Sequence, residues 1–266
     1  MTDRQSSYDP TETGVLRLSK SSFGTYSMCP KQYWWNYIAG LSAPPNDAMI
    51  RGTAIHAILE DALLNKHPVL TAASSHGHWF DDHGTHSMDE LLRQFQSHGD
   101  YIFIEAEKKH EVPATINGRD VVLVGKIDGV FRMPSGQLLI VELKTGELGQ
   151  SKVSRTKKEL NFYRYMLGID GYDITDCFYM VIAPDATNAD VATKLANKRN
   201  TTVFIGELSG VAYIEKVHLG SYRKTVEKIE QAVEGIFNEE WPTKWSDYFC
   251  PEWCAFHLSC EQEILG

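Results

Sequence analysis

Gly125-Lys126-Ile127-Asp128 and Val141-Glu142-Leu143-Lys144 are the two stretches that decide the fold of this chain. Each lies at the end of an apolar run, and Met133-Pro134-Ser135-Gly136-Gln137 between them is typical of a turn. We therefore expect a β-hairpin that brings Asp128 towards Glu142. Side chains alternate along a strand, so Glu142 and Lys144 project from the same face. Two carboxylates beside an ammonium group predict a divalent-cation site suited to phosphodiester cleavage.

The composition is that of a folded globular protein. The chain has 266 residues, of which 42% are hydrophobic, with 6 Trp, 12 Tyr and 11 Phe. No apolar run approaches the ~20 residues of a membrane span, and the first residues lack an apolar signal segment. We therefore expect a cytoplasmic protein, or one in the host cytoplasm if a phage encodes it. The 5 cysteines, without an export signal, favour metal binding or redox use over disulfides.

The formal net charge of -9 does not exclude a nucleic-acid substrate. Affinity for phosphates depends on local patches, and acids that hold metal ions also count in this sum. One candidate DNA-binding patch follows the predicted hairpin and consists of Lys152, Arg155, Lys157 and Lys158. A solvated loop and helix start is the alternative interpretation of these residues. No G-x-x-x-x-G-K-[ST] motif occurs, so any helicase acting with this chain must be a separate protein.

The order of the predicted elements indicates a mixed α/β or α+β fold. Apolar periodicity predicts helices over residues 22–38, 48–64, 88–107, 156–167 and 222–237. Three β-like runs cover residues 112–144, and further strands are expected at 177–182, 203–205 and 212–219. We expect a flexible arm over residues 1–17, a polar His-rich loop over 66–90, and a single domain over 18–266.

Two further motifs flank the hairpin. Gly52-x-x-x-His56 stands at the head of the second predicted helix, and Glu159-x-x-x-Tyr163 lies on the helix after the hairpin, with both side chains on one face. Taken singly, each has an ordinary explanation: a core or surface histidine, and an amphipathic helix. Glu142 and Lys144 could likewise form a structural ion pair. However, a carboxylate within an apolar run needs a partner or a metal ion when it is buried.

In this order the four motifs resemble those of the PD-(D/E)XK nuclease superfamily. Within it they are similar to the RecB-like exonucleases, which include the nuclease domain of AddB and the CRISPR-associated exonucleases. The resemblance extends from about Leu18 to Cys260, except for the His-rich stretch. It implies a restriction-endonuclease-like core, in which a mixed β-sheet is flanked by helices. One departure is Glu159, which adds a charge where the family usually has Gln.

The resemblance also implies a role for each motif residue. The ligands of Mg²⁺ or Mn²⁺ would be His56, Asp128, Glu142 and the carbonyl oxygen of Leu143. Lys144 would orient or help deprotonate the attacking water and would stabilise charge in the transition state. Glu159 and Tyr163 would position the DNA strand or Lys144.

The cysteines form a second candidate site. Cys250, Cys254 and Cys260 have the spacing C-x3-C-x5-C, and Cys29 lies far upstream on the first predicted helix, whereas Cys177 is expected in the core. Four thiolates suit an iron–sulfur cluster or zinc; buried cysteines without a ligand are the third alternative. The arrangement resembles that of RecB-like exonucleases with a [4Fe–4S] cluster, where C-x2-C-x5-C is commoner. This resemblance implies an iron–sulfur clasp, a cluster that joins the N-terminal helix to the C-terminal tail.

The preferred hypothesis is a metal-dependent DNA exonuclease acting on single-stranded ends, in recombination, repair, phage DNA metabolism or CRISPR adaptation. Its partners would be DNA and separate recombination or adaptation proteins, with no membrane; the oligomeric state stays open. The alternatives are an endonuclease on the same core and a non-catalytic iron–sulfur DNA-binding scaffold. An aromatic cluster near Cys29 could stack on unpaired bases or pack around the cofactor; its members are Tyr33, Trp34, Trp35 and Tyr37.

Overall fold

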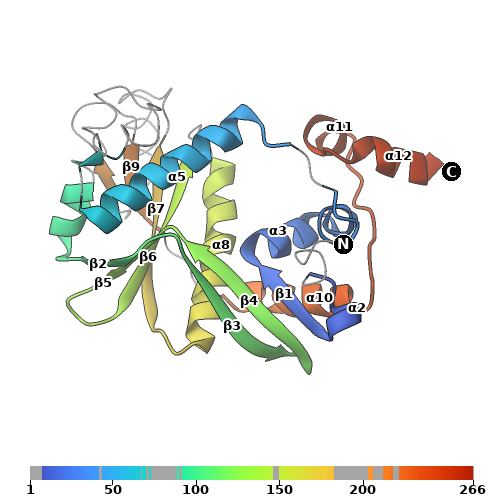
Figure 1. Cartoon of the computed structure of the whole chain (residues 1–266), viewed down its shortest axis with the longest axis horizontal. Helices are drawn as coiled ribbons and strands as arrows, with labels where there is room; N and C mark the ends of the chain where they lie inside the picture. The colour runs from blue at the N-terminus through green and yellow to red at the C-terminus, as the bar shows by residue number, and fades with distance from the viewer. Residues whose placement is uncertain are drawn as a thin grey trace. The chain divides into compact units, whose positions relative to one another are not determined.

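The computed structural model describes residues 8–41, 44–66, 68–69, 72, 89, 92–145, 150–182, 203–205, 212–217 and 222–265. The chain divides into two compact units, each built from segments far apart in the sequence (Figure 1). Unit 1 comprises Met1–Pro44, His110–Gly125 and Ser221–Gly266, and unit 2 comprises Pro45–Lys109 and Lys126–Gly220. Because the units interleave along the chain, the single domain expected over residues 18–266 stays a prediction.

Unit 2 is built on a mixed six-stranded sheet with the strand order β2-β5-β6-β7-β9-β8. Its strands are β2 (Ile102–Glu105), β5 (Gly129–Arg132), β6 (Leu138–Thr145), β7 (Ile174–Ile182), β8 (Val203–Ile205) and β9 (Ala212–Lys216). Strands β5 and β6 pair antiparallel, as the predicted hairpin requires, whereas β6 and β7 pair parallel. Helix α8 (Gln150–Ile169) lies between β6 and β7 in the chain and packs against both. The mixed α/β fold class is therefore confirmed.

Strand β6 lies at the centre of this unit and is buried over most of its length. Its residues Leu139, Val141 and Leu143 belong to one core cluster with Ile55 and Ile58 of helix α5 (Asp47–Asn65). Asn46 begins α5, because its side chain accepts a hydrogen bond from the N–H of Met49. Since side chains alternate along β6, the residues between the three core positions project from the opposite face.

Unit 1 contains a three-stranded sheet with the order β1-β4-β3. Strand β1 (Val15–Ser19) pairs parallel with β4 (Arg119–Ile127), which follows β3 (Lys108–Ile116) through a tight turn. Asn117 and Gly118 both have positive φ in that turn, as an Asn-Gly hairpin requires. Helix α10 (Arg223–Phe237) buries an apolar face and packs against α3 (Lys20–Met28).

The first predicted helix is interrupted. Residues 22–38 fall into α3, α4 (Pro30–Tyr33) and the π-helix η1 (Trp34–Ile38), because Cys29 adopts an extended backbone with φ -152. A residue that precedes proline is biased away from the helical region, and Pro30 follows Cys29. The helices expected over 48–64 and 222–237 are confirmed as α5 and α10.

Two other expectations differ from the structure. The helix expected over 88–107 is helical at 92–98 but gives way to strand β2, whose isoleucines favour extended structure. The flexible arm expected over 1–17 is wrong for its second half, because α2 (Pro10–Thr13) and β1 are ordered and Leu16 is fully buried. Most of the His-rich stretch 66–90 lies outside the described residues.

Helix α8 is longer than the stretch 156–167 expected for it. The strand expected at 203–205 is confirmed as β8, and that at 212–219 is confirmed as the shorter strand β9. Among the described helices, none combines the length and the apolar character that crossing a membrane needs.

Candidate metal centre

Strand register brings the two predicted carboxylates together. Gly129 pairs with Val141 in the β5–β6 hairpin, so the preceding residue, Asp128, comes opposite Glu142. Asp128 lies in the bend between β4 and β5, and its Oδ2 accepts a hydrogen bond of 2.6 Å from the N–H of Leu143. This bond fixes the Asp128 carboxylate against strand β6.

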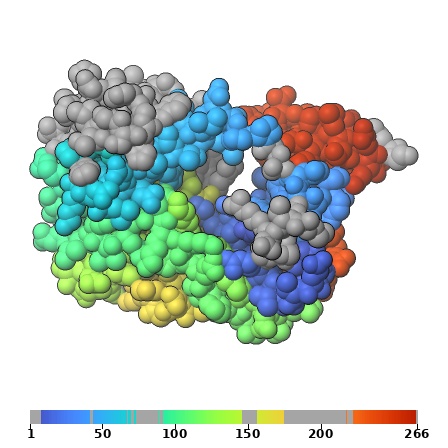
Figure 2. Space-filling model, in the orientation of Figure 1, coloured from blue at the N-terminus to red at the C-terminus, as the bar shows by residue number. Residues whose placement is uncertain are grey.

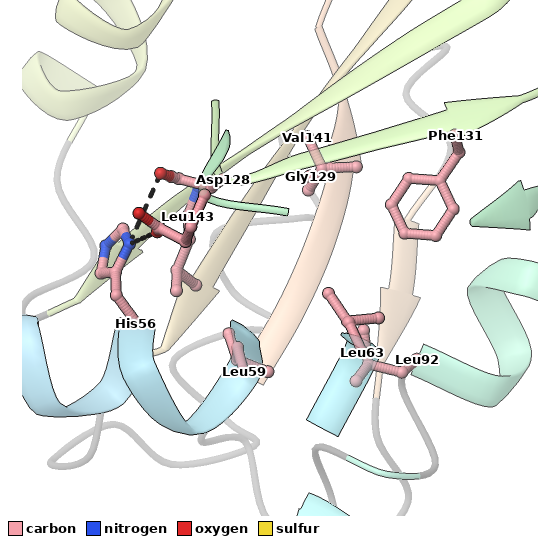
Figure 3. A pocket seen from close by; sticks show the side chains of 10 residues that line it. His56, Leu59, Leu63, Leu92, Asp128, Gly129, Phe131, Val141 and Leu143 are labelled. Atoms are coloured by element: carbon pink, nitrogen blue, oxygen red, sulfur yellow. Dashed lines mark hydrogen bonds and ion pairs between the residues drawn. The ribbon is translucent and has the colours of Figure 1, made fainter. Parts of the chain in front are cut away.

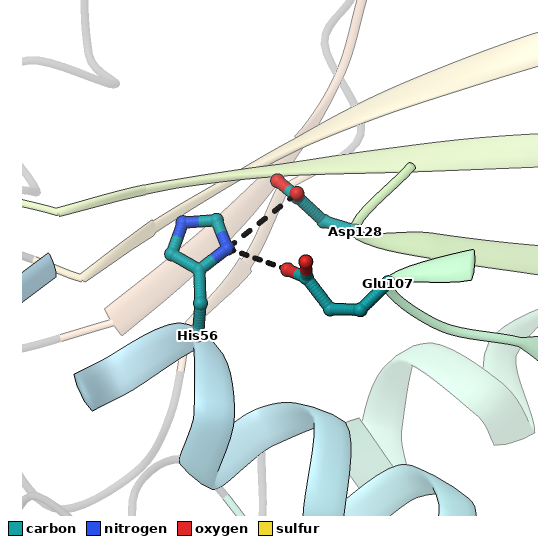
Figure 4. A group of neighbouring side chains, drawn as sticks. All are labelled: His56, Glu107 and Asp128. Atoms are coloured by element: carbon teal, nitrogen blue, oxygen red, sulfur yellow. Dashed lines mark hydrogen bonds and ion pairs between the residues drawn. The ribbon is translucent and has the colours of Figure 1, made fainter. Parts of the chain in front are cut away.

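A histidine and two carboxylates meet at the same bend (Figure 4). Nδ1 of His56 lies 2.8 Å from Oε1 of Glu107 and 3.4 Å from Oδ1 of Asp128. The candidate ligand atoms of these three residues all lie within 4.8 Å of one another. We refer to His56, Glu107 and Asp128 as the acidic triad.

The backbone conformation explains how His56 and Glu107 are positioned beside Asp128. His56 lies on α5, one turn after Gly52, where an added Cβ would stand 3.1 Å from Oγ1 of Thr145 at the end of β6. Glycine in Gly52-x-x-x-His56 thus permits the close approach of α5 to the sheet. Glu107 has a positive φ of 53, and its N–H donates to the carbonyl of Ile127 over 2.8 Å, which places it beside Asp128.

The members of the acidic triad shift one another's pKa values. Burial lowers the pKa of His56, but hydrogen bonds to Asp128 and Glu107 outweigh burial and raise it to about 9. Burial raises the pKa of Glu107, but His56 and an ion pair with Lys126 outweigh burial and lower it to about 2. The Glu107 carboxylate is therefore held ionised beside a positively charged imidazole.

Lys144 lies between two further carboxylates of unit 2. Its Nζ is 2.6 Å from Oε1 of Glu142 and 2.6 Å from Oε2 of Glu159 on α8. The contact between Glu142 and Lys144 confirms that both project from one face of β6. The Glu142 side chain is only 1% exposed, whereas that of Lys144 is 25% exposed. The ammonium group is thus fixed at the edge of the buried sheet and still reaches the surface.

Tyr163, on α8, lies beside the carboxylates of Glu142 and Asp128. Its hydroxyl donates to the carbonyl oxygen of Lys126 over 2.6 Å. Burial raises the pKa of Tyr163, and the carboxylates of Glu142 and Asp128 raise it further. Tyr163 therefore lies close to both carboxylates and stays protonated, but its hydrogen bond is to the main chain rather than to Lys144.

A small cavity of about 20 Å³ adjoins the triad (Figure 3). His56, Glu107 and Asp128 line it on one side. Apolar side chains form the remainder, among them Leu59, Leu63, Leu92 and Phe131. The apolar lining strengthens electrostatic interactions among the charged groups at its rim.

In unit 1 the four cysteines of the second candidate site line one cavity of about 30 Å³. Cys29 ends α3, Cys250 and Cys254 lie on and directly after α11 (Phe249–Trp253), and Cys260 lies on α12 (His257–Leu265). Burial raises the pKa of Cys254, and the neighbouring thiols of Cys260, Cys250 and Cys29 raise it further. The four thiols are thus close enough to repel one another when ionised, as expected where a cation balances them.

The sequence profile of the PD-(D/E)XK nuclease superfamily matches residues 17–261. This chain belongs to that superfamily. Membership indicates a metal-dependent nuclease with DNA as substrate, and the acidic triad is a possible metal-binding group. One solved structure, described as "Crystal structure of SSO0001", is 14% identical to this chain and has a TM-score of 0.46. The match covers 92% of this chain and 85% of the chain in that structure. No curated protein matches this chain.

The structure places the predicted catalytic and metal-binding residues in unit 2, but not in one group. His56 and Asp128 lie in the acidic triad, whereas Glu142 contacts Lys144. Leu143 contacts the site through its N–H. Of the predicted DNA-binding patch, the two residues with described side chains, Lys157 and Lys158, are exposed on α8, and Lys152 and Arg155 lie on the same helix.

Glu107 is the triad member that the sequence motifs do not include. It lies where a helix was expected to end, and no PD-(D/E)XK motif covers it. The available signal was the run Ile102-Phe103-Ile104-Glu105, whose β-branched residues favour a strand that leads to an acid. Cys177 lies on β7, among residues whose side chains are not described.

Proposed function

We propose that this chain is a Mg²⁺- or Mn²⁺-dependent deoxyribonuclease that degrades single-stranded DNA from its ends. The observation that supports this proposal is that Asp128 contacts both the acidic triad and the strand that bears Glu142 and Lys144. Its Oδ1 approaches His56 of the acidic triad, and its Oδ2 bonds to the backbone of the strand that bears Glu142 and Lys144. These two contacts support a site in which metal ligands and a cation meet at one bend of the chain.

The donor set fits a small divalent cation. Asp128 and Glu107 offer carboxylate oxygens and His56 offers an imidazole nitrogen, a combination that suits Mg²⁺ and Mn²⁺. Glu142, opposite Asp128 in the hairpin, would complete the set together with the carbonyl oxygen of Leu143. A bound ion would polarise a phosphoryl oxygen and lower the pKa of its water. The proton on His56 must leave before the imidazole can bind a metal ion.

Lys144 supplies the fixed positive charge. Its ammonium group, held by Glu142 and Glu159, would orient the attacking water and meet the negative charge that develops on the phosphoryl group. Glu159 would act by positioning Lys144, since it contacts that residue directly. Tyr163 would act by fixing the backbone at Lys126, two residues before Asp128.

The cysteine site would hold a [4Fe–4S] cluster, with Cys29, Cys250, Cys254 and Cys260 as ligands. The four cysteines line one cavity of unit 1, and the resemblance to RecB-like exonucleases with such a cluster favours it over a single zinc ion. Within unit 1 such a cluster would join the end of α3 to α11 and α12, and its role would be structural.

Exonuclease action on single-stranded ends rests on the resemblance to RecB-like enzymes. The exposed Lys157 and Lys158 on α8, the helix that bears Glu159, would contact the phosphate backbone. Recombination, repair, phage DNA metabolism and CRISPR adaptation are the processes that such an activity would serve.

The test is degradation of end-labelled linear and circular single-stranded DNA by anaerobically purified protein, with Mn²⁺, Mg²⁺ or EDTA. We expect metal-dependent loss of the linear substrate alone. Lys144→Ala and Asp128→Ala should abolish cleavage with the fold and visible colour unchanged, whereas Lys108→Ala, at an exposed lysine of the same unit, should not. Cleavage of circles would replace the proposal with an endonuclease, and no cleavage at all would favour the DNA-binding scaffold.

A further inference from the structure

We propose that Lys126 is an exchangeable cation of the acidic triad. Its ammonium group holds Glu107 in the metal-free protein and moves to a phosphate of the DNA strand when a divalent cation binds. The inference rests on the proposed metal-dependent nuclease and adds to it a DNA-binding residue to which the sequence motifs assign no role. Lys126 and Glu107 both belong to unit 2.

The first observation is that both carboxylate oxygens of Glu107 contact a basic side chain. Oε1 lies 2.8 Å from Nδ1 of His56, and Oε2 forms an ion pair with Nζ of Lys126. The side chain of Glu107 is only 7% exposed, so its charge depends on such partners. A metal ion on either oxygen would lie beside positive charge, and like charges repel. A metal ion that uses Glu107 as a ligand therefore requires both cations to give way.

The second observation is that the two cations give way by different means. An imidazole can lose its proton and then serve as a metal ligand itself. A lysine ammonium keeps its proton at neutral pH, so Lys126 has to move instead. Its side chain is 59% exposed and has a flexible four-carbon stem. The ammonium group can therefore turn into solvent without leaving a charge buried and unpaired.

The third observation is that Glu107 is positioned without Lys126. Its backbone has a φ of 53, and its N–H donates to the carbonyl of Ile127 over 2.8 Å. The backbone of Lys126 is also fixed, because its carbonyl accepts the hydrogen bond of 2.6 Å from the Tyr163 hydroxyl. The exchange thus requires movement of one exposed side chain, while the ligands stay in place.

The destination of the ammonium group follows from the chemistry of the substrate. A DNA strand that places a phosphate on the metal ion brings further phosphates to the surface around it, and exposed lysines bind these groups. Metal binding would release the Lys126 ammonium at the same surface. The two ligands are therefore coupled: the strand gains one phosphate contact only at a centre that holds its metal ion.

The first measurement is Mn²⁺ affinity by isothermal titration calorimetry in the absence of DNA. Lys126→Met, which keeps the length of the side chain without its charge, is compared with Lys108→Met. Lys108 is a matched control, because it is 61% exposed and forms a 2.8 Å ion pair with Glu105, outside the triad. We expect several-fold tighter binding in Lys126→Met alone. An affinity that is unchanged, weaker, or raised equally in Lys108→Met would overturn the proposal.

The second measurement is the salt dependence of binding to a labelled single-stranded oligonucleotide, by fluorescence anisotropy. Both substitutions are made in the Lys144→Ala background, in which we expect no cleavage. With Mn²⁺, Lys126→Met should reduce the slope of log K against log salt concentration by about 0.7, the value for one phosphate contact on a single strand. With EDTA its slope should equal that of Lys108→Met. Equal slopes under both conditions, or an equal reduction in EDTA, would overturn the exchange.

Two further comparisons separate the exchange from other effects. Lys126→Arg keeps the positive charge and should bind Mn²⁺ no more tightly than the wild type. If Lys126→Met does not fold, Lys126→Gln, which also lacks the charge, is measured in its place. A wild type that binds Mn²⁺ and DNA but cleaves no DNA would end the nuclease proposal, while the two measurements still decide the role of Lys126. A wild type that binds no Mn²⁺ would overturn the exchange together with the metal centre.

Discussion

Glu107 gives the clearest test of the acidic triad at the level of single residues. Glu107→Gln keeps the size of the side chain but removes a charge that lies 2.8 Å from the His56 imidazole. We expect the affinity for Mn²⁺ to fall about tenfold or more, because the remaining ligands carry less charge. Isothermal titration calorimetry and the Mn²⁺ dependence of cleavage both measure this change. Asp173→Asn, at an exposed acid in unit 2, is the control. An unchanged Mn²⁺ affinity of Glu107→Gln would contradict a role of Glu107 as a metal ligand.

Glu159 stands where the resemblance to RecB-like exonucleases predicts Gln. Its contact of 2.6 Å with Nζ of Lys144 can be replaced by the side-chain carbonyl of glutamine, but not by alanine. We therefore expect Glu159→Gln to keep most of the activity, and Glu159→Ala to lose roughly ten- to hundredfold in rate because Lys144 loses its position. Single-turnover cleavage rates distinguish the two. Equal losses in both variants would mean that the negative charge of Glu159, not its close contact with Lys144, is required.

At this scale the sequence predicts some site residues and not others. Asp128, Glu142 and Lys144 follow from strand periodicity and a turn, both local properties of the chain. Glu107 does not, because its place depends on a left-handed backbone at that residue and on a bond to Ile127, twenty residues further on. The split between the triad and the Lys144 contacts also depends on the bend at Asp128, which periodicity does not describe.

Among the elements, the contact of α10 with α3 offers a sharp test of packing. A Cβ on Gly235 would stand 1.9 Å from the hydroxyl oxygen of Tyr26, a buried side chain that also donates to the carbonyl of Glu240. We expect Gly235→Ala to lower the free energy of unfolding by about 1–3 kcal/mol, as overpacking does. Denaturant unfolding measures the change.

Two controls belong with this variant. Gly168→Ala lies on α8, where an added Cβ meets nothing within 4 Å, and it should be neutral or stabilising. Adding Tyr26→Phe to Gly235→Ala removes the clashing hydroxyl and should restore part of the stability. A Gly235→Ala protein as stable as the wild type would mean that α10 shifts at no cost.

Element boundaries were predictable where local signals agree. Helix α5 has an Asn cap and apolar residues at helical spacing, and both are visible in the sequence. The first helix was predicted as continuous because its aromatic residues are periodic, but Pro30 sets the backbone of Cys29 and divides it. Strand β1 was missed because a five-residue strand becomes stable only by pairing with β4, more than a hundred residues further along the chain.

For the molecule as a whole, the cysteine site predicts a dependence of stability on the cofactor. Cys254→Ser should bleach the purified protein and lower its melting temperature by several degrees, because α11 and α12 lose their link to the end of α3. Absorbance in the visible range and thermal unfolding measure the two effects. Ala255→Ser places the same hydroxyl at the adjacent, exposed position and should change neither. Unchanged colour and stability in Cys254→Ser would contradict the proposed iron–sulfur clasp.

Sequence motifs predicted the superfamily and the mixed fold of the whole chain, but not its division into two interleaved units. Motifs report local chemistry, whereas the division depends on which distant segments share a core. The C-terminal helices α11 and α12, red in Figure 2, belong to the unit that also holds β1 and α3. No local pattern links them except the cysteines.

The interleaving of unit 1 has a consequence for how the protein is made. Cys29 leaves the ribosome 221 residues before Cys250. At roughly 5–20 residues per second, synthesis separates them by on the order of ten seconds or more. The nascent α3 must remain without α10 and without its partner cysteines for that time, so the four thiols can come together only after residues 221–260 have emerged. A cofactor held by all four thiols could therefore load only after this segment has emerged, which is also when all the segments of unit 1 are present.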